Sequence, residues 1–388
     1  MIADAILTNP LQVHIARACE SAGGWLGFDE FMNLALYSPG LGYYACTREI
    51  FGWMPHETGD QGGDFVTAPE MTRLFGQTLA TQIAQALQAT QTLEIWEFGA
   101  GTGALARDVL DELRRLGVPV SRYNIVEVSG ALRERQQQCL AAHAQVVRWL
   151  DALPDTIQGV VIGNEVLDAM PVKLLARKSG VWFERGVATI SESQPSQPPE
   201  FSWTDQATAL RPPLNIASNH DYVTEIHPQA EAFIRTVADC LSAGAVFLID
   251  YGFPESEYYH PQRHMGTVMC HQAHRSDTNP LADVGLKDIT AHVNFTAIAL
   301  AGQDAGLEVL GYATQARFLM NCGLLERLKS ASLQDKVMAQ KLILEHEMGE
   351  LFKVIGFAKR AADASDDKPG QEPWHAIGFA QGDRTHTL

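Results

Sequence analysis

The chain has 388 residues, of which 46% are hydrophobic and 19% are charged, a composition typical of globular rather than disordered proteins. Its length allows one large core with insertions, or two domains. The formal charge of −17 argues against nucleic acid as the main partner, because phosphate binding needs clustered Lys and Arg. A basic protein partner is compatible with this charge, and so is a simple contribution to solubility.

The six cysteines are scattered along the chain and form no Cys-x-x-Cys pair. They therefore suggest neither a zinc ribbon nor a redox dithiol, and we expect no metal site. No apolar run approaches membrane-spanning length, and the N-terminus lacks the basic residues of a signal or transit peptide. Because free cysteines are typical of a reducing compartment, we expect a cytoplasmic protein without membrane insertion.

The N-terminal part is predicted to be helical. Asn9 suits a helix cap and Pro10 the first position of that helix, and a second short helix is predicted over 29–37. Residues 40–66 are rich in Gly and aromatic residues and are interpreted as loop. The run Thr67-Ala68-Pro69-Glu70 has capping-box spacing and predicts the start of a longer helix.

From Leu93 onward the sequence alternates between strand and helix patterns. Strands are predicted near 93–98, 123–128, 146–150, 159–163 and 245–250, and helices near 103–116, 130–142 and 229–242. This alternation predicts a parallel sheet wound with helices, in which ligands bind beyond the carboxyl ends of the strands.

Two stretches interrupt the alternation. Residues 176–222 contain a polar, proline-bearing run and predict an insertion with a short hairpin and a mobile loop, and a second irregular segment spans 253–285. The C-terminal part predicts a strand over 307–312, a long helix over 324–350, a strand over 352–358 and a polar, partly disordered tail from Ala361.

The most informative motif is the run Glu97-Phe98-Gly99-Ala100-Gly101-Thr102-Gly103 at the end of the first predicted parallel strand. Alternate glycines at such a place let the backbone turn tightly and bring N–H groups against a ligand. The spacing also fits a dinucleotide fingerprint, with Ala104 in place of the last glycine. Glu97 favours S-adenosylmethionine, because a carboxylate there opposes a pyrophosphate but suits an amino group and a sulfonium.

Acidic residues follow the next two predicted strands. Glu127 ends the second, where a carboxylate binds ribose hydroxyls in both dinucleotide and S-adenosylmethionine sites. Asp151 follows the third, within reach of an adenine amino group, although Asp at a strand end is also a common turn residue.

A second polar cluster follows the fourth predicted strand. Asn164, Glu165 and Asp168 emerge there from an apolar run, where burying them is costly unless they bind something or cap a helix. A helix cap explains Asn164 but not all three. Carboxylates beside a guanidinium can hold it in line for methyl transfer and keep its charge on the nitrogens that do not attack.

Two further segments have both a structural and a functional interpretation. Residues 62–70, which include Gly63 and Asp64, form either a plain loop before a helix or a lid over the cofactor. His292 lies alone in the run 288–295, where a single His is more often structural than catalytic.

Five motifs occur in a fixed order along the chain. They are Gly-Asp-Phe-Val-Thr-Ala-Pro-Glu at 63–70, Glu-Phe-Gly-Ala-Gly-Thr-Gly at 97–103, Gly-Asn-Glu-Val-Leu-Asp-Ala-Met-Pro-Val at 163–172, Ile-Asp-Tyr-Gly at 249–252 and Asp-Ile-Thr-Ala-His-Val-Asn-Phe at 288–295. From about residue 10 to 360 the chain resembles the MidA family of S-adenosylmethionine-dependent methyltransferases. Mitochondrial members of that family are arginine methyltransferases that act on a subunit of respiratory complex I during its assembly.

The resemblance implies a role for each candidate residue. The loop at the methionine side of S-adenosylmethionine would be formed by Glu97, Gly99, Gly101 and Gly103, and the ribose would be held by Glu127. The substrate face would be formed by Asn164, Glu165 and Asp168. The site would be closed by His292 and the loop that holds Gly63 and Asp64.

We therefore expect an α/β protein with a class I, Rossmann-like methyltransferase core of seven mostly parallel strands. The expected parts are an N-terminal helical cap over 1–92, the core over 93–360 with a second lobe inserted near 176–222 and 253–300, and a polar tail over 361–388. By resemblance, the reaction moves a methyl group to an arginine guanidinium of a protein, such as a complex I subunit. An NAD(P)-dependent oxidoreductase on the same fold and an assembly chaperone with little turnover remain as alternatives.

Overall fold

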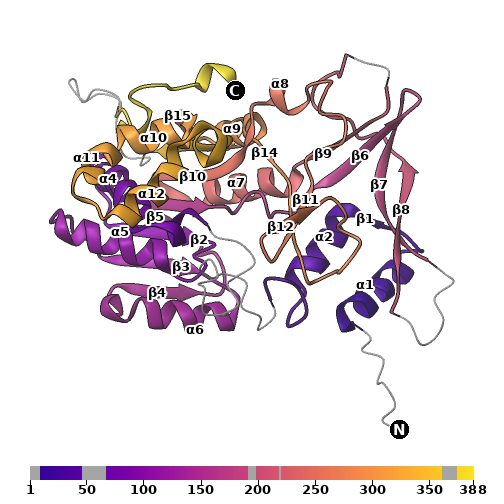
Figure 1. The fold of residues 1–388 in the computed structure, drawn as a ribbon, viewed down its shortest axis with the longest axis horizontal. Coiled ribbons are helices and arrows are strands. Elements are labelled where there is room, and N and C mark those ends of the chain that lie inside the picture. The colour runs from indigo at the N-terminus through magenta and orange to yellow at the C-terminus, as the bar shows by residue number, and fades with distance from the viewer. Residues whose placement is uncertain (1–8, 46–66, 191–197, 218–219, 361–373) are drawn as a thin grey trace, which may run out of the picture. The chain divides into compact units, whose positions relative to one another are not determined.

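The computed structural model describes residues 9–45, 67–190, 198–217, 220–360 and 374–388. The chain forms two compact units, each built from three segments. Unit 1 comprises Met1–Ile50, Ala169–Ala230 and Glu255–His292, and unit 2 comprises Phe51–Asp168, Glu231–Pro254 and Val293–Leu388. Figure 1 shows the elements of both units.

Unit 2 is organised around an eight-stranded sheet. Its strands are β2 (Glu94–Phe98), β3 (Arg122–Val126), β4 (Val147–Leu150), β5 (Ile157–Asn164), β10 (Leu241–Phe253), β14 (Val293–Asn294), β15 (Glu308–Thr314) and β16 (Phe352–Lys359). Seven follow the order β15-β16-β10-β5-β2-β3-β4, and the short β14 pairs with β10. Only β16 runs antiparallel to its neighbours in this path. The expected seven-stranded, mostly parallel core is thus confirmed.

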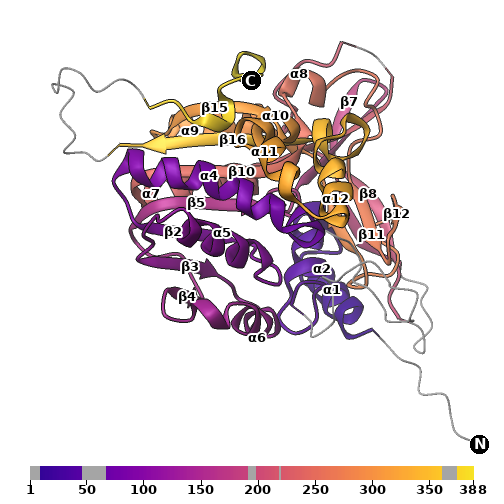
Figure 2. The same cartoon turned by 60° about the vertical axis from the view of Figure 1, so that its left-hand side comes forward.

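The helices of unit 2 pack on this sheet and on one another. They are α3 (Ala68–Met71), α4 (Arg73–Thr90), α5 (Ala104–Arg115), α6 (Gly130–Cys139), most of α7 (Pro228–Cys240), α9 (Phe295–Asp304), α10 (Gln315–Asn321), α11 (Leu324–Ser330) and α12 (Leu333–Ile343), with short turns η1 (Ala141–His143), η2 (Glu345–Gly349), η3 (Ile377–Phe379) and η4 (Thr385–Thr387). Figure 2 shows α4 and α5 beside the strands that they cover. Helix α4 belongs to unit 2, whereas the sequence analysis placed its residues in an N-terminal cap over 1–92.

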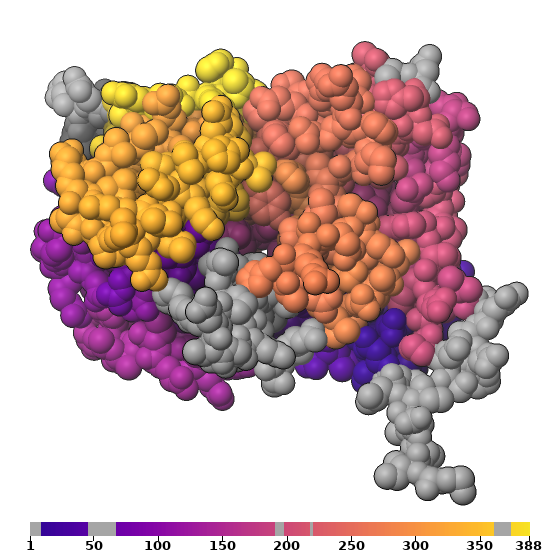
Figure 3. All heavy atoms as spheres, in the orientation of Figure 1, coloured from indigo at the N-terminus to yellow at the C-terminus, as the bar shows by residue number. Residues whose placement is uncertain are grey.

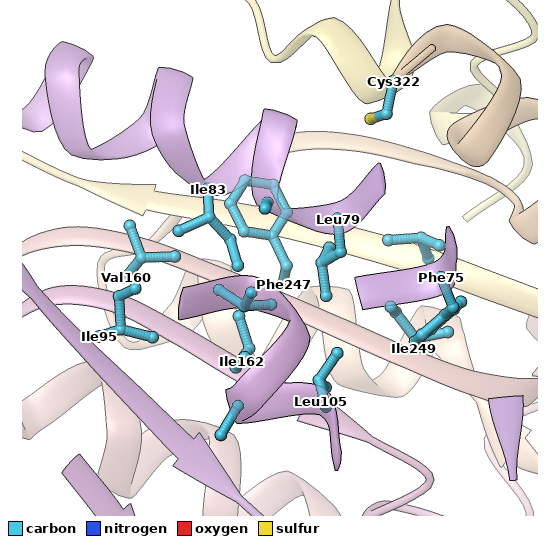
Figure 4. Close-up of a cluster of buried hydrophobic side chains, with 14 of the residues drawn as sticks. Phe75, Leu79, Ile83, Ile95, Leu105, Val160, Ile162, Phe247, Ile249 and Cys322 are labelled. Atoms are coloured by element: carbon cyan, nitrogen blue, oxygen red, sulfur yellow. The ribbon is translucent and has the colours of Figure 1, made fainter. Parts of the chain in front are cut away.

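The packing of the core of unit 2 follows from the spacing of apolar side chains along its strands and helices. Every second residue of the central strands points toward α4, whose apolar residues recur every three or four positions. Figure 4 shows Phe75, Leu79 and Ile83 of α4 directed at Val160, Ile162, Phe247 and Ile249 of the sheet, with Leu105 of α5 alongside. These side chains are at most 3% exposed, so they hold the strand ends rigidly beneath the glycine loop.

The expected long helix over 324–350 is wrong. The chain breaks into α11, α12 and η2, because Ala331 is extended (ψ 155°) and Ser332 starts a new helix by accepting a hydrogen bond from the Asp335 N–H at 3.0 Å. Figure 3 shows residues 315–350 as one continuous surface of unit 2.

Residues 374–388 are ordered, whereas the sequence predicted a polar, partly disordered tail from Ala361. Phe379 is 6% exposed and packs against Phe318, with ring centroids 5.3 Å apart. The remainder of the expected tail, 361–373, lies outside the described residues.

Unit 1 contains two smaller sheets. The first has the order β1 (Leu26–Gly27), β7 (Val181–Thr189), β6 (Lys173–Lys178) and β9 (Tyr222–Ile226), with β8 (Phe201–Ala207) also paired to β7; the second has the order β12 (Arg275–Asp277), β11 (Met269–Gln272) and β13 (Asp288–Thr290). The helices are α1 (Pro10–Ser21), α2 (Phe28–Tyr37) and α8 (Glu255–Tyr258). Asn9 caps α1 as predicted. The segment 176–222 is more regular than the short hairpin expected there.

Candidate functional site

The glycine loop joins β2 to α5 at the carboxyl edge of the sheet. Gly99, Gly101 and Gly103 have φ of 64°, 51° and 88°, a left-handed backbone that residues with a Cβ rarely adopt. A Cβ on Gly99 would lie 2.9 Å from Cγ2 of Val166, which belongs to the turn after β5. The predicted loop is therefore present, its glycines are required by its conformation, and it lies against the turn that carries the second predicted polar cluster.

Glu97 lies beneath this loop and is 2% exposed. The Tyr123 hydroxyl donates to its Oε2 at 2.7 Å. Burial raises the pKa of Glu97 to about 7, and the Tyr123 hydrogen bond offsets only part of that rise. A nearby cation would favour its ionised form, so the geometry is compatible with the predicted role opposite a positive group.

Glu127 follows β3 and is 8% exposed. Its Oε1 accepts from the Ser129 N–H at 2.8 Å, and its Oε2 accepts from Nε2 of Gln136 at 3.0 Å. Burial raises its pKa, and these two hydrogen bonds with the charge of Arg133 lower it. A carboxylate has about four lone-pair sites, so acceptor capacity remains for ribose hydroxyls.

Asp151, placed near an adenine by the sequence, follows β4 with a side chain that is 84% exposed. It pairs with Arg133 of α6, which also donates to the Glu127 carbonyl at 2.7 Å. Its contact with an adenine stays a prediction. Val128, the residue after Glu127, is 80% exposed.

The turn after β5 holds the second polar cluster. Glu165 has φ of 54°, which is unusual for a non-glycine residue, and its N–H donates to the Ile249 carbonyl at 2.9 Å. Nδ2 of Asn164 donates to Oε1 of Glu165 at 2.9 Å. Asn164 and Asp168 are 8% and 5% exposed. The structure thus brings the three predicted residues together at the end of one strand.

The helix-cap interpretation of Asn164 is wrong, because residues 165–172 form turns and the antiparallel strand β6 begins at Lys173. The capping box at Thr67 is also wrong. Among the described residues Thr67 makes no side-chain cap bond, and Glu70 instead accepts from the Thr102 hydroxyl of the glycine loop. Thr72 is the residue that caps α4.

Asp250 was missed as a site residue. It is 0% exposed, and its Oδ2 accepts from the N–H groups of Val166, Leu167 and Asp168 at 3.1, 2.9 and 3.3 Å. Its Oδ1 accepts from the Tyr251 N–H at 2.9 Å. The motif Ile-Asp-Tyr-Gly at 249–252 contains this residue, but nothing in its pattern indicated which turn the carboxylate holds.

Three carboxyl groups gather at this turn. The pKa of Asp250 lies well above its ordinary value, first because the group is buried and then because the charges of Asp168 and Glu165 repel its ionised form. The turn next to the glycine loop is therefore a place where a bound cation would be stabilised.

The remaining predicted site residues lie elsewhere. His292 belongs to unit 1, where its N–H donates to the Thr267 hydroxyl at 3.1 Å and its carbonyl accepts from Nε2 of His227 at 2.9 Å. Its role in closing the site stays a prediction. Gly63 and Asp64 lie outside the described residues.

The described residues show no sign of two other classes of site. They contain no group of three or more His, Cys, Asp or Glu side chains arranged to hold a metal ion. No helix within the described ranges is long and apolar enough to span a membrane.

Comparison with known proteins identifies the family. Residues 78–313, more than half of the chain, match the family model described as "Putative S-adenosyl-L-methionine-dependent methyltransferase". The chain belongs to this family. A protein from Burkholderia thailandensis, with a crystal structure bound to S-adenosyl-homocysteine, is 46% identical, covers 100% of this chain and 98% of its own, and has a TM-score of 0.90.

Curated relatives agree with this assignment. Protein arginine methyltransferase NDUFAF7, mitochondrial, of Xenopus tropicalis is 27% identical over 399 residues, which cover 90% of this chain and 86% of that protein. Its human namesake is 27% identical over 359 residues, covering 83% of this chain and 75% of that protein. The resemblance to MidA-type methyltransferases is thus confirmed, and the methyltransferase uses S-adenosyl-L-methionine as its cofactor.

The glycine loop fits this cofactor. Its left-handed glycines place no side chain over the loop backbone at the start of α5, and Glu127 keeps acceptor capacity for hydroxyls. The nicotinamide alternative is set aside because the family and the S-adenosyl-homocysteine complex both indicate the methyl donor.

Proposed function

We propose that this methyltransferase transfers the methyl group of S-adenosylmethionine to a guanidinium nitrogen of an arginine in a protein. The observation that carries the proposal is the turn after β5, in which the Asp168 N–H donates to Asp250, the Glu165 N–H donates to the neighbouring Ile249 carbonyl, and Val166 lies against Gly99 of the glycine loop. The cofactor supplies an electrophilic methyl group, and the chain supplies a negatively charged turn for the acceptor.

Charge favours a cationic acceptor at this turn. Four backbone N–H groups hold Asp250 in place, and we infer that Glu165 and Asp168, on the turn itself, are the carboxylates that face a substrate. A guanidinium stays protonated in water and presents a planar fork of donors that matches carboxylate geometry. Its binding would offset the repulsion among the three carboxyl groups, which a neutral acceptor would leave in place.

The names of the relatives support the same acceptor, since the curated NDUFAF7 proteins are called protein arginine methyltransferases. Their identity to this chain, 24% to 27%, is too low to transfer a substrate. A respiratory complex I subunit as the acceptor, and a cytoplasmic location, therefore remain parts of the proposal.

The proposal is tested first by finding the acceptor. Mass spectrometry of arginine methylation in cells with and without this protein should show arginine sites that lose their methyl groups when the protein is removed. Cofactor binding without any such site would favour the alternative of an assembly factor with little turnover.

The second test uses Glu165→Gln with the acceptor so found. We expect unchanged cofactor affinity and a turnover lower by about 100- to 1,000-fold, on the order of 3–4 kcal/mol, because an amide fills the same space but cannot orient a cation. Glu134→Gln, which removes one exposed charge on α6, is the matched control and should leave turnover unchanged. Wild-type turnover in Glu165→Gln would show that the Glu165 carboxylate does not orient the acceptor.

A further inference from the structure

Helix α6 has an unusual buried residue. Gln136 is 0% exposed and is the single buried residue of this helix, whose other positions are exposed or half-buried. A helix on a sheet normally buries apolar side chains, because burying an amide is unfavourable unless its hydrogen bonds are satisfied. The contacts of Gln136 therefore explain why it is there.

Its amide makes hydrogen bonds to three different segments. Nε2 donates to the Gly101 carbonyl and to Oε2 of Glu127, both at 3.0 Å, and Oε1 accepts from Nε1 of Trp149 at 2.9 Å. An indole N–H can only donate, so it determines which side of the amide carries oxygen. Trp149 thus turns the two N–H groups of Gln136 toward the glycine loop and the acid after β3.

The same side chain packs against the loop. A Cβ on Gly103 would lie 3.4 Å from Cα and 3.5 Å from Cγ of Gln136, so the loop fits closely over α6. One side chain therefore determines the spacing between Gly101 and Glu127.

We propose that Gln136 is a positioning residue for the methyl donor, because its amide holds the glycine loop and the Glu127 carboxylate at the spacing that one cofactor molecule needs. This inference rests on the assignment of these two elements to the cofactor. It concerns binding alone and needs no knowledge of the methyl acceptor.

A second consequence concerns the charge of Glu127. Gln136 is one of the groups that lower the pKa of Glu127 against the effect of burial. The charged groups around this carboxyl are Arg133 of α6, which also lowers its pKa, and Asp151 beyond β4, which pairs with Arg133. Without the Gln136 amide, Glu127 takes up a proton at higher pH and becomes a weaker acceptor for a ribose hydroxyl.

The experiment measures S-adenosyl-homocysteine affinity by titration calorimetry between pH 5.5 and 8. In Gln136→Met we expect affinity about tenfold weaker at pH 8, since two hydrogen bonds to the site are lost. As the pH is lowered, we also expect the affinity of this variant to start falling at a higher pH than the affinity of the wild type. The matched control is Gln137→Met, the same change at an exposed neighbour on the helix, which should behave as wild type.

Gln136→Glu keeps the size of the side chain and provides a second test. Its carboxylate repels Glu127 at pH 8 and can donate only when protonated, so its affinity should recover on acidification while that of Gln136→Met falls. A purely structural glutamine predicts lower stability with unchanged affinity and pH profile. Wild-type affinity and pH profile in either folded variant, checked by circular dichroism, would overturn the proposal.

The result is separable from the proposed arginine specificity. Weakened, pH-shifted binding in the Gln136 variants supports the inference even if no methylated arginine is found. Unchanged binding in these variants overturns it even if arginine methylation is demonstrated.

Discussion

Glu127 and Asp250 are both buried carboxyl groups at the carboxyl edge of the same sheet, yet their hydrogen-bond partners differ. Asp250 bonds to backbone 82 to 84 residues away, in the turn after β5. Glu127 bonds within nine residues of itself, to Ser129 and Gln136. Asp250 is fully sealed, whereas Glu127 is 8% exposed beside an uncovered valine. The useful difference is the sequence separation between each carboxylate and its hydrogen-bond donors. From it we infer that Asp250 maintains the fold and that Glu127 is available to a ligand.

The largest effect that this comparison predicts is on stability. Asp250→Ala removes the acceptor of four backbone N–H groups and should lower the free energy of unfolding by about 4 kcal/mol, measured by urea denaturation. Losing four hydrogen bonds alone would cost more, but the substitution also removes a buried carboxyl group whose burial is unfavourable. Asp239→Ala, at an exposed position of α7, should change stability by less than about 0.5 kcal/mol. A similar, small change in both variants would show that Asp250 is not structural.

For Glu127 we expect a loss of cofactor affinity and little loss of stability. Glu127→Ala should weaken S-adenosylmethionine and S-adenosyl-homocysteine equally, by about tenfold to hundredfold (on the order of 1.5–3 kcal/mol), because both carry the same ribose. The fold should survive, since only short-range hydrogen bonds are lost. Calorimetric titration of both ligands checks this, and unequal losses would indicate that Glu127 faces the sulfonium and not the ribose.

A smaller effect follows from Glu97, a third strand-end carboxyl with a pKa of about 7. Its pKa is higher in the folded than in the unfolded chain, so its ionisation destabilises the fold as pH rises from about 4.5 toward 7 and above. Between pH 6 and 8, Glu97→Gln should therefore gain about 1 kcal/mol of unfolding free energy relative to the wild type. Urea denaturation at both pH values measures this difference, and parallel pH dependence in the two proteins would show that Glu97 is ionised throughout.

Local signals in the sequence predicted most of the core correctly. The glycine turn at 99, 101 and 103 and the strand–helix alternation depend on residues close together in the chain, and both predictions were confirmed. Glu127 lies directly after β3, and its contact with a ribose stays a prediction. The break within 324–350 was also local, since Ser332 and Asp335 have the spacing of a helix start, but the apolar pattern hid it.

The groups that the sequence did not reveal depend on distant contacts. Asp250 acts on a turn that precedes it by more than 80 residues, and Gln136 is indistinguishable by pattern from Gln137 and Gln138 in the same helix. Only packing shows which of the three glutamines is buried. Contacts to the cofactor and acceptor remain predictions for the same reason, because they depend on molecules outside the chain.

The place of β16 in the sheet affects how the protein is made. This strand lies between β10 and β15, although residues 352–359 are translated after both. While the ribosome is still adding the preceding residues, one long edge of β10 has no strand beside it for most of its length, and β15 lacks the only strand with which it pairs in the part of the chain that the structure describes. The sheet can therefore be completed only after residues 352–359 have been made, and late, long-range pairing of this kind leaves unpaired strand edges exposed to aggregation until the last strand inserts.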